Sequence, residues 1–143
     1  MSEETAVTTL PQLVFLHGLE SGPHGSKFHL LAGLGLGTVV APDCEGVHDP
    51  HERLDIIEAT LNGLDDLVLV GSSFGGLMAL LYAVRHPDQV AGLVLCAPAV
   101  HRPDLMEVPA CQAVFRCMCC TGDRTTWCRW RRCGRTARRT GCR

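Results

Sequence analysis

A serine between two glycines is the strongest chemical signal in this chain. The motif is Gly71-x-Ser73-x-Gly75; it follows the apolar run 67–70 directly and leads into a helical pattern over 74–85. A nucleophile on a tight strand-to-helix turn lifts its hydroxyl above the sheet, and the turn leaves room only for small residues on either side. The motif therefore predicts Ser73 as a catalytic nucleophile. Ser72 is a weaker candidate because no glycine stands two residues after it.

Two backbone N–H groups are expected to stabilise the oxyanion that forms when such a serine attacks a carbonyl. The residue after the nucleophile, Phe74, would supply the first. The second would come from the loop after the run 12–16, where Leu19 is preferred and Glu20 is the alternative. Gly18 would allow the turn that directs this loop.

His17, at the start of the same loop, is a candidate for the general base. Where a serine stands on a strand-to-helix turn of this kind, however, the base follows the nucleophile in the chain. His17 precedes Ser73 by 56 positions. We interpret His17 as a residue that packs the loop.

The elements that would position these residues alternate between strand and helix. Apolar runs predict strands, and apolar residues spaced three and four apart predict helices. The predicted strands are 12–16, 38–43, 67–70 and 90–96, and the predicted helices are 27–34, one from Pro50 to near Gly63, and 74–85. This order predicts an α/β fold with a parallel sheet flanked by helices.

Three segments resemble the small bacterial esterases of the α/β-hydrolase superfamily. They are His17-Gly-Leu-Glu-Ser-Gly-Pro, Pro42-Asp-Cys-Glu-Gly and Gly71-Ser-Ser-Phe-Gly-Gly, and the resemblance extends over about residues 13–103. It implies an α/β-hydrolase-type sheet and hydrolysis of a carboxylic ester or thioester through an acyl-enzyme, without a cofactor or metal. Asp43 and Glu45 could shape access to the site or form a local Asx turn.

The acid and histidine of a catalytic triad should follow the serine. Only two histidines do so. His86 lies at the far end of the 74–85 helix, several turns from Ser73, and is therefore excluded as the base. His101 and Asp104 remain as a candidate base and acid, although neither stands where the resemblance places these residues.

The composition changes sharply near residue 110. Residues 1–110 hold 14 acidic and 4 basic side chains, whereas residues 111–143 hold one acid, nine arginines and seven of the nine cysteines. We therefore predict a truncated hydrolase domain over 1–110, with its C-terminal strands missing, and an Arg/Cys-rich tail over 111–143 that is disordered or out of frame.

A GC-rich coding strand read in the wrong frame gives a composition of this kind. When the coding bases from Cys119 onward are regrouped into the alternative reading frame, they permit the amino-acid sequence L-H-G-R-P-D-D-V-V-P. A frameshift near 110–115 would remove the acid and the base.

Two other interpretations of the tail are open. Cys117, Cys120, Cys128 and Cys133 could supply four thiolates to zinc, although three cysteines are left over and the spacing is irregular. An arginine-rich arm could bind nucleic acid. Neither a metal nor a nucleic-acid partner is the expectation, because an evolved arm or zinc knuckle would not have this mixture of residues.

The N-terminal residues 1–12 have no basic and apolar segments of the signal-peptide kind, and no apolar run is long enough for a membrane span. We therefore expect a cytoplasmic protein that acts on a small-molecule ester or thioester, with Cys44 and Cys96 as reduced thiols. The chain is predicted to be a serine hydrolase whose activity is impaired by the missing triad partners. The alternative is a non-catalytic domain of the same fold.

Overall fold

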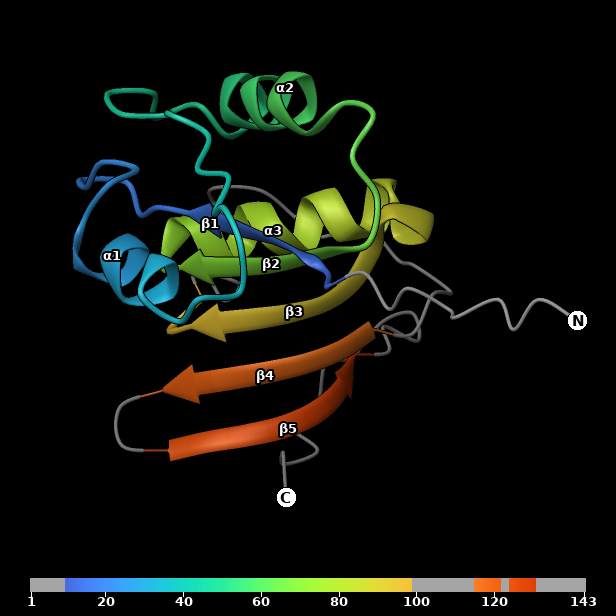
Figure 1. Cartoon of the computed structure of the whole chain (residues 1–143). Helices are drawn as coiled ribbons and strands as arrows, with labels where there is room; N and C mark the ends of the chain where they lie inside the picture. The colour runs from blue at the N-terminus through green and yellow to red at the C-terminus, as the bar shows by residue number, and fades with distance from the viewer. Residues whose placement is uncertain (1–9, 99–114, 122–123, 131–143) are drawn as a thin grey trace, which may run out of the picture.

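The computed structural model describes residues 10–98, 115–121 and 124–130. Strands and helices alternate along the first range (Figure 1). The elements are β1 (Gln12–Leu16), α1 (Ser26–Ala32), α2 (Pro50–Leu61), β2 (Leu67–Ser72), α3 (Phe74–Arg85), the 3₁₀ turn η1 (Pro87–Gln89), β3 (Val90–Cys96), β4 (Phe115–Thr121) and β5 (Arg124–Trp130). The predicted class, a parallel sheet flanked by helices, is confirmed.

The sheet has the order β1-β2-β3-β4-β5. Its first four strands run parallel, with Leu16 paired to Gly71 and Ser72 paired to Cys96 at their carboxyl ends. Figure 1 shows the arrowheads of these four strands pointing the same way. The loop after β1 and the turn after β2 therefore leave the sheet at the same edge.

The predicted strand over 38–43 is reduced to a single bridge. Val40 pairs with Val14, donating its N–H to the Leu13 carbonyl and accepting from the Phe15 N–H at 3.0 and 2.9 Å. The next donor of a parallel ladder would be residue 42, which is Pro42 and has no N–H. The prediction of a full strand was therefore wrong beyond this bridge.

The two faces of the sheet are covered by different helices. Side chains that alternate along a strand point to opposite faces. Val14 and Leu69 belong to the core cluster that includes α2 and α3, whereas Phe15 and Val70 belong to a second cluster packed against α1. The apolar run in β2 is therefore buried on both faces, as its sequence predicts.

The helix α3 is the centre of the larger core. It contacts β1, β2, β3 and α2, and ten of its residues, Phe74 to Ala83, are buried in succession. A helix that is apolar all round needs cover on every side. Its N-terminus is consequently held in a fixed place above the sheet edge.

The strands β4 and β5 lie in the segment assigned above to the tail, where the sequence analysis expects no strand. They pair antiparallel, with Cys117 opposite Cys128. Two seven-residue segments rich in Thr, Trp, Phe and Cys, joined by two residues, can pair in this way whatever their coding origin. Strand pairing does not test the frameshift, which stays a prediction.

Within the described ranges, no helix combines the length and the apolar character that crossing a bilayer requires. Cys44 is buried, Cys96 is partly buried, and neither forms a disulfide there.

The start of α2 yields a stability prediction. The Asp49 carboxylate accepts hydrogen bonds from the N–H groups of His51 and Glu52 at 2.8 and 3.0 Å, which caps the helix. Asp49→Ala should lower the free energy of unfolding by about 1 kcal/mol. Asp55→Ala, at an exposed position inside the same helix, should change it by less than about 0.5 kcal/mol. Urea unfolding of both variants measures the difference, and equal losses would contradict the capping role.

Candidate active site

Ser73 occupies the turn between β2 and α3 in an uncommon backbone conformation. Its φ is 53° and its ψ is −115°, in a region that residues other than glycine seldom adopt. Ser73 is exposed, whereas the residues that follow it in α3 are buried. Its N–H donates to the Cys96 carbonyl at 2.9 Å, and its own carbonyl accepts from the Gly76 N–H at 3.0 Å. The turn is therefore tied both to the end of β3 and to its own helix.

The flanking glycines are required by close backbone contacts. A Cβ atom on Gly71 would lie 2.5 Å from the Gly75 carbonyl oxygen. A Cβ atom on Gly75 would overlap the Leu16 carbonyl oxygen and lie 2.6 Å from that of His17. Strand β1, strand β2 and helix α3 therefore meet here without room for a methyl group, as the motif predicts.

The loop after β1 lies beside this turn. A Cβ atom on Gly18 would be 3.5 Å from the Ser72 carbonyl oxygen and 3.8 Å from the Ser73 Cβ. Phe74 is the first residue of α3, and the first N–H groups of a helix have no partner within it. The structure thus brings together Ser73, Gly18, the partly buried Leu19 next to it, and the start of α3.

His17 is buried, with 1% of its surface exposed, and both of its ring nitrogens are engaged. Nε2 accepts from the Cys44 N–H at 3.0 Å, so Nδ1 carries the proton that is donated to the Gly18 carbonyl at 2.8 Å. Burial lowers the pKa of the imidazole, although the Gly18 hydrogen bond partly opposes this. The neutral ring therefore holds the loop in place, in agreement with its interpretation as a packing residue.

Arg53 is a buried residue beneath the loop that is not among the residues predicted from the sequence. This residue of α2 is 1% exposed, and its guanidinium donates to four backbone carbonyls. Nε reaches Val47 at 2.6 Å, Nη1 reaches His17 at 3.0 Å, and Nη2 reaches Gly18 at 3.1 Å and Leu19 at 3.4 Å. The sequence did contain a signal for this role, since Arg53 stands four residues before Ile57 on the apolar face of α2. A cation on a buried face needs hydrogen-bond partners within the core.

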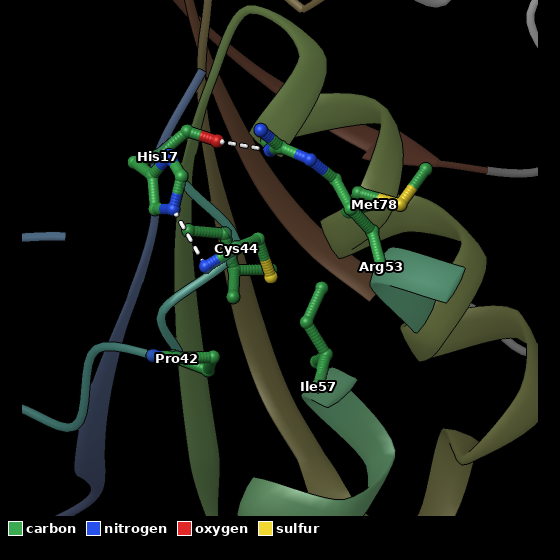
Figure 2. Close-up of a pocket in the computed structure, with 8 residues that line it drawn as sticks. His17, Pro42, Cys44, Arg53, Ile57 and Met78 are labelled. Carbon is green, nitrogen blue, oxygen red and sulfur yellow. Dashed lines mark hydrogen bonds between the residues drawn. The ribbon is translucent and has the colours of Figure 1, made fainter. Parts of the chain in front are cut away.

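Figure 2 shows how these groups meet. The His17 ring points to the backbone nitrogen of Cys44, and the Arg53 side chain extends to the His17 carbonyl. The pocket between them has no space for a water-sized sphere, and Ser73 does not line it. We therefore regard it as part of the packed support beneath the loop and not as a substrate site.

Among the other polar candidates, His86 and Asp43 have partners away from Ser73. His86 lies at the opposite end of α3, where its ring nitrogen contacts the Glu58 carboxylate at 3.0 Å. Asp43 accepts from the Glu45 N–H at 3.0 Å, which is the local Asx turn considered above. His101 and Asp104 lie outside the described residues, as do Cys133 and most of the tail. Among the residues that the structure describes, no group of three or more His, Cys, Asp or Glu side chains is placed to hold a metal ion.

Comparison with known proteins decides the family. The model of the family described as serine aminopeptidase, S33 (Hydrolase_4), matches residues 37–121, more than half of the 143 residues. The match includes the strand–serine–helix turn and ends at the last residue of β4. The chain belongs to this family of the α/β-hydrolase superfamily.

The relatives of this chain include an esterase and lipases. It is 39% identical over 107 residues to the pimeloyl-[acyl-carrier protein] methyl ester esterase of Aromatoleum aromaticum, covering 69% of this chain and 43% of the relative. It is 37% identical over 100 residues to the lipase LipV of Mycobacterium tuberculosis, covering 62% and 38%. The chain therefore spans less than half the length of these curated relatives.

A solved structure is similar to this chain in fold. The monoacylglycerol lipase of Paleococcus ferrophilus superposes with a TM-score of 0.50 at 30% identity, covering 62% of this chain and 39% of the lipase. The superposition supports the predicted fold over that share of the chain.

The close contact at Gly75 gives a second stability prediction. Gly75→Ala should lower the free energy of unfolding by about 3 kcal/mol or more, because the added methyl group meets backbone oxygens that cannot move independently. Gly25→Ala is the matched control, since its φ is −77° and no atom lies within 4 Å of the added Cβ. Urea unfolding should show a loss of no more than about 1 kcal/mol for the control, because Gly25 is the N-cap of α1 and alanine is a poorer cap than glycine. A Gly75 variant as stable as the control would show that the two backbones are not in contact.

The backbone strain at Ser73 predicts an unusual order of stability. Ser73→Gly should be more stable than Ser73→Ala by about 1 kcal/mol, because glycine relieves a strain of about 1–3 kcal/mol and loses part of this gain to its extra freedom in the unfolded chain. At Ser26, the first residue of α1, alanine should instead be the more stable replacement. Thermal unfolding of the four variants tests this reversal, and the same order at both sites would argue against strain.

Proposed function

We propose that this chain derives from a serine hydrolase that cleaves a carboxylic ester or thioester through an acyl-enzyme on Ser73. The observation that carries the proposal is the exposed Ser73 hydroxyl on a strained turn, at the N-terminus of a buried helix. Strain of this kind is kept where it serves a site, and the family to which the chain belongs supports the same chemistry. The relatives named as an esterase and a lipase make a small ester the expected substrate.

The proposed reaction begins with attack of Ser73 Oγ on the carbonyl carbon. The C–O or C–S bond to the leaving group breaks as the tetrahedral intermediate collapses, and water then releases the acid from the serine. The N–H groups of Phe74 and Leu19, with Glu20 as the alternative to Leu19, would stabilise the oxyanion. The positive end of the α3 dipole would add to this stabilisation.

Proton transfer needs a second group beside the Ser73 hydroxyl. A base must take the Ser73 proton and deliver it to the leaving group. His17 and His86 are engaged elsewhere, and the candidates His101 and Asp104 lie outside the described residues. We therefore propose that this chain turns over esters weakly or not at all. An oxyanion hole without the other partners retains a rate about 10³–10⁴-fold above that of water.

Labelling of the serine tests the proposal separately from turnover. A fluorophosphonate probe should add to the wild-type chain, and the adduct should map to Ser73 by mass spectrometry. Ser73→Ala should abolish labelling, whereas Ser72→Ala, which removes the neighbouring partly buried hydroxyl, should retain it. Hydrolysis of p-nitrophenyl acetate and butyrate should be slow and should vanish in the Ser73 variant only. Labelling at Ser72, or equal labelling of both variants, would overturn the assignment.

A non-catalytic domain of the same fold is the second candidate. It is favoured by the engagement of both ring nitrogens of His17, which leaves this loop histidine no free nitrogen to accept a proton from Ser73. A soluble chain that melts cooperatively, resists the fluorophosphonate and hydrolyses no ester would support it.

A further inference from the structure

The buried Arg53 occupies an unusual position for a cation. Its side chain is within the core, yet none of the carboxylates in the described ranges lies within 4.0 Å of its nitrogens. Burial lowers the pKa of the guanidinium, but arginine stays charged at any ordinary pH. A buried charge is costly unless its hydrogen-bonding capacity is met, and here backbone carbonyls meet it. Because a buried charge of this kind gives little net stability, we look for a role of Arg53 other than stabilising the fold.

Three of the four carbonyls belong to consecutive residues. Arg53 donates to the oxygens of His17, Gly18 and Leu19, which form the loop that borders Ser73. In a trans peptide the C=O and the following N–H point in opposite directions. The Gly18 carbonyl and the Leu19 N–H are one peptide unit, and the Leu19 carbonyl and the Glu20 N–H are the next. A guanidinium on the oxygen side of both units therefore turns their N–H groups away from itself.

The same guanidinium also contacts the other half of the site. Its central carbon lies 4.9 Å from the centroid of the Phe74 ring, which is a cation–π distance. Phe74 is the first residue of α3 and the predicted source of the first oxyanion donor. Arg53 is thus in contact with the residues of both predicted donors, although they are 55 positions apart in the sequence.

We propose that Arg53 is a positioning residue for the oxyanion hole. Its planar fork fixes the orientation of the peptide units that end in the Leu19 and Glu20 N–H groups, and polarises them as donors through their carbonyls. It also fixes these groups relative to Phe74. This inference rests on the proposed function, because it assumes that an oxyanion forms at Ser73.

The test compares Arg53→Met with Arg53→Lys. Methionine fills much of the same volume without charge, and replacement of a buried charge by an apolar residue is often neutral or stabilising. Lysine keeps the charge and loses the fork. Arg85→Met is the matched control, since Arg85 pairs with Glu58 on the surface at 2.9 Å, far along α3 from the turn. Asp49→Ala controls for lower stability without loss of the carbonyl contacts.

The first readout is the rate at which the fluorophosphonate labels Ser73, per folded molecule. We expect Arg53→Met to lower the limiting rate at saturating probe about 10-fold or more, with little change in the probe concentration at half-saturation. Arg53→Lys should lie between this variant and wild type. Arg85→Met and Asp49→Ala should label at the wild-type rate. A residue with only a structural role would change the folded fraction and leave the rate per folded molecule unchanged.

The second readout does not need a reactive serine. NMR order parameters of the Leu19 and Glu20 amides should be near 0.85 in wild type and fall toward about 0.6 in the Arg53 variants. The carbonyl carbon shift of Gly18 should also move as its hydrogen bond is lost. Arg85→Met should leave both unchanged.

These outcomes separate the two proposals. Wild-type labelling rates and unchanged Gly18–Glu20 signals in a folded Arg53 variant would overturn the positioning role. If the wild-type chain is not labelled, the proposed function fails for this chain, and the NMR signals alone decide whether Arg53 holds the loop. If Arg53→Met does not fold, the same measurements on Arg53→Lys decide the question.

Discussion

The close approach of helix α3 to the end of strand β1 is the constraint on which the site depends. Gly75 lies so near the Leu16 and His17 carbonyls that no side chain fits between them. This contact places the N-terminus of α3 over the sheet edge and forces the chain through the strained conformation of Ser73. The strain persists because the surrounding packing over-determines it: α3 is buried for most of its length and Ser73 is tied to the end of β3. A mobile helix would relax the turn and lose the exposed hydroxyl.

The loop after β1 is fixed by groups behind it. His17 and Arg53 bind backbone atoms of the loop and of the segment around Cys44, so three parts of the chain are locked together beneath the turn. Both are polar side chains with 1% exposure, and both form their hydrogen bonds with backbone groups. The apparent pocket between them in Figure 2 is consequently a support and not a cavity for substrate.

Family membership and activity are separate matters for this chain. It belongs to the Hydrolase_4 family, but it spans less than half of the curated relatives it matches, and a superfamily fold does not fix a substrate or guarantee catalysis. The described residues contain the turn with the proposed nucleophile Ser73 and the loop that His17 and Arg53 support. The residues that would act as general acid and base in the reaction remain proposals.

Local sequence was enough to predict the serine turn and most of the elements before residue 97. The strands at Gln12–Leu16 and Val90–Cys96 and the helix Phe74–Arg85 follow from local apolar patterns and turn chemistry. Pro42 limited the expected strand at 38–43 because a ladder needs a donor that proline lacks, and the pairing in β4 and β5 was hidden by an unusual composition. Only the tertiary structure revealed Arg53 as the support of the Gly18–Leu19 loop. A periodic pattern shows which face of a helix is buried. Three of the four backbone carbonyls that accept from Arg53, however, belong to residues more than 30 positions away, and only the fold brings them together.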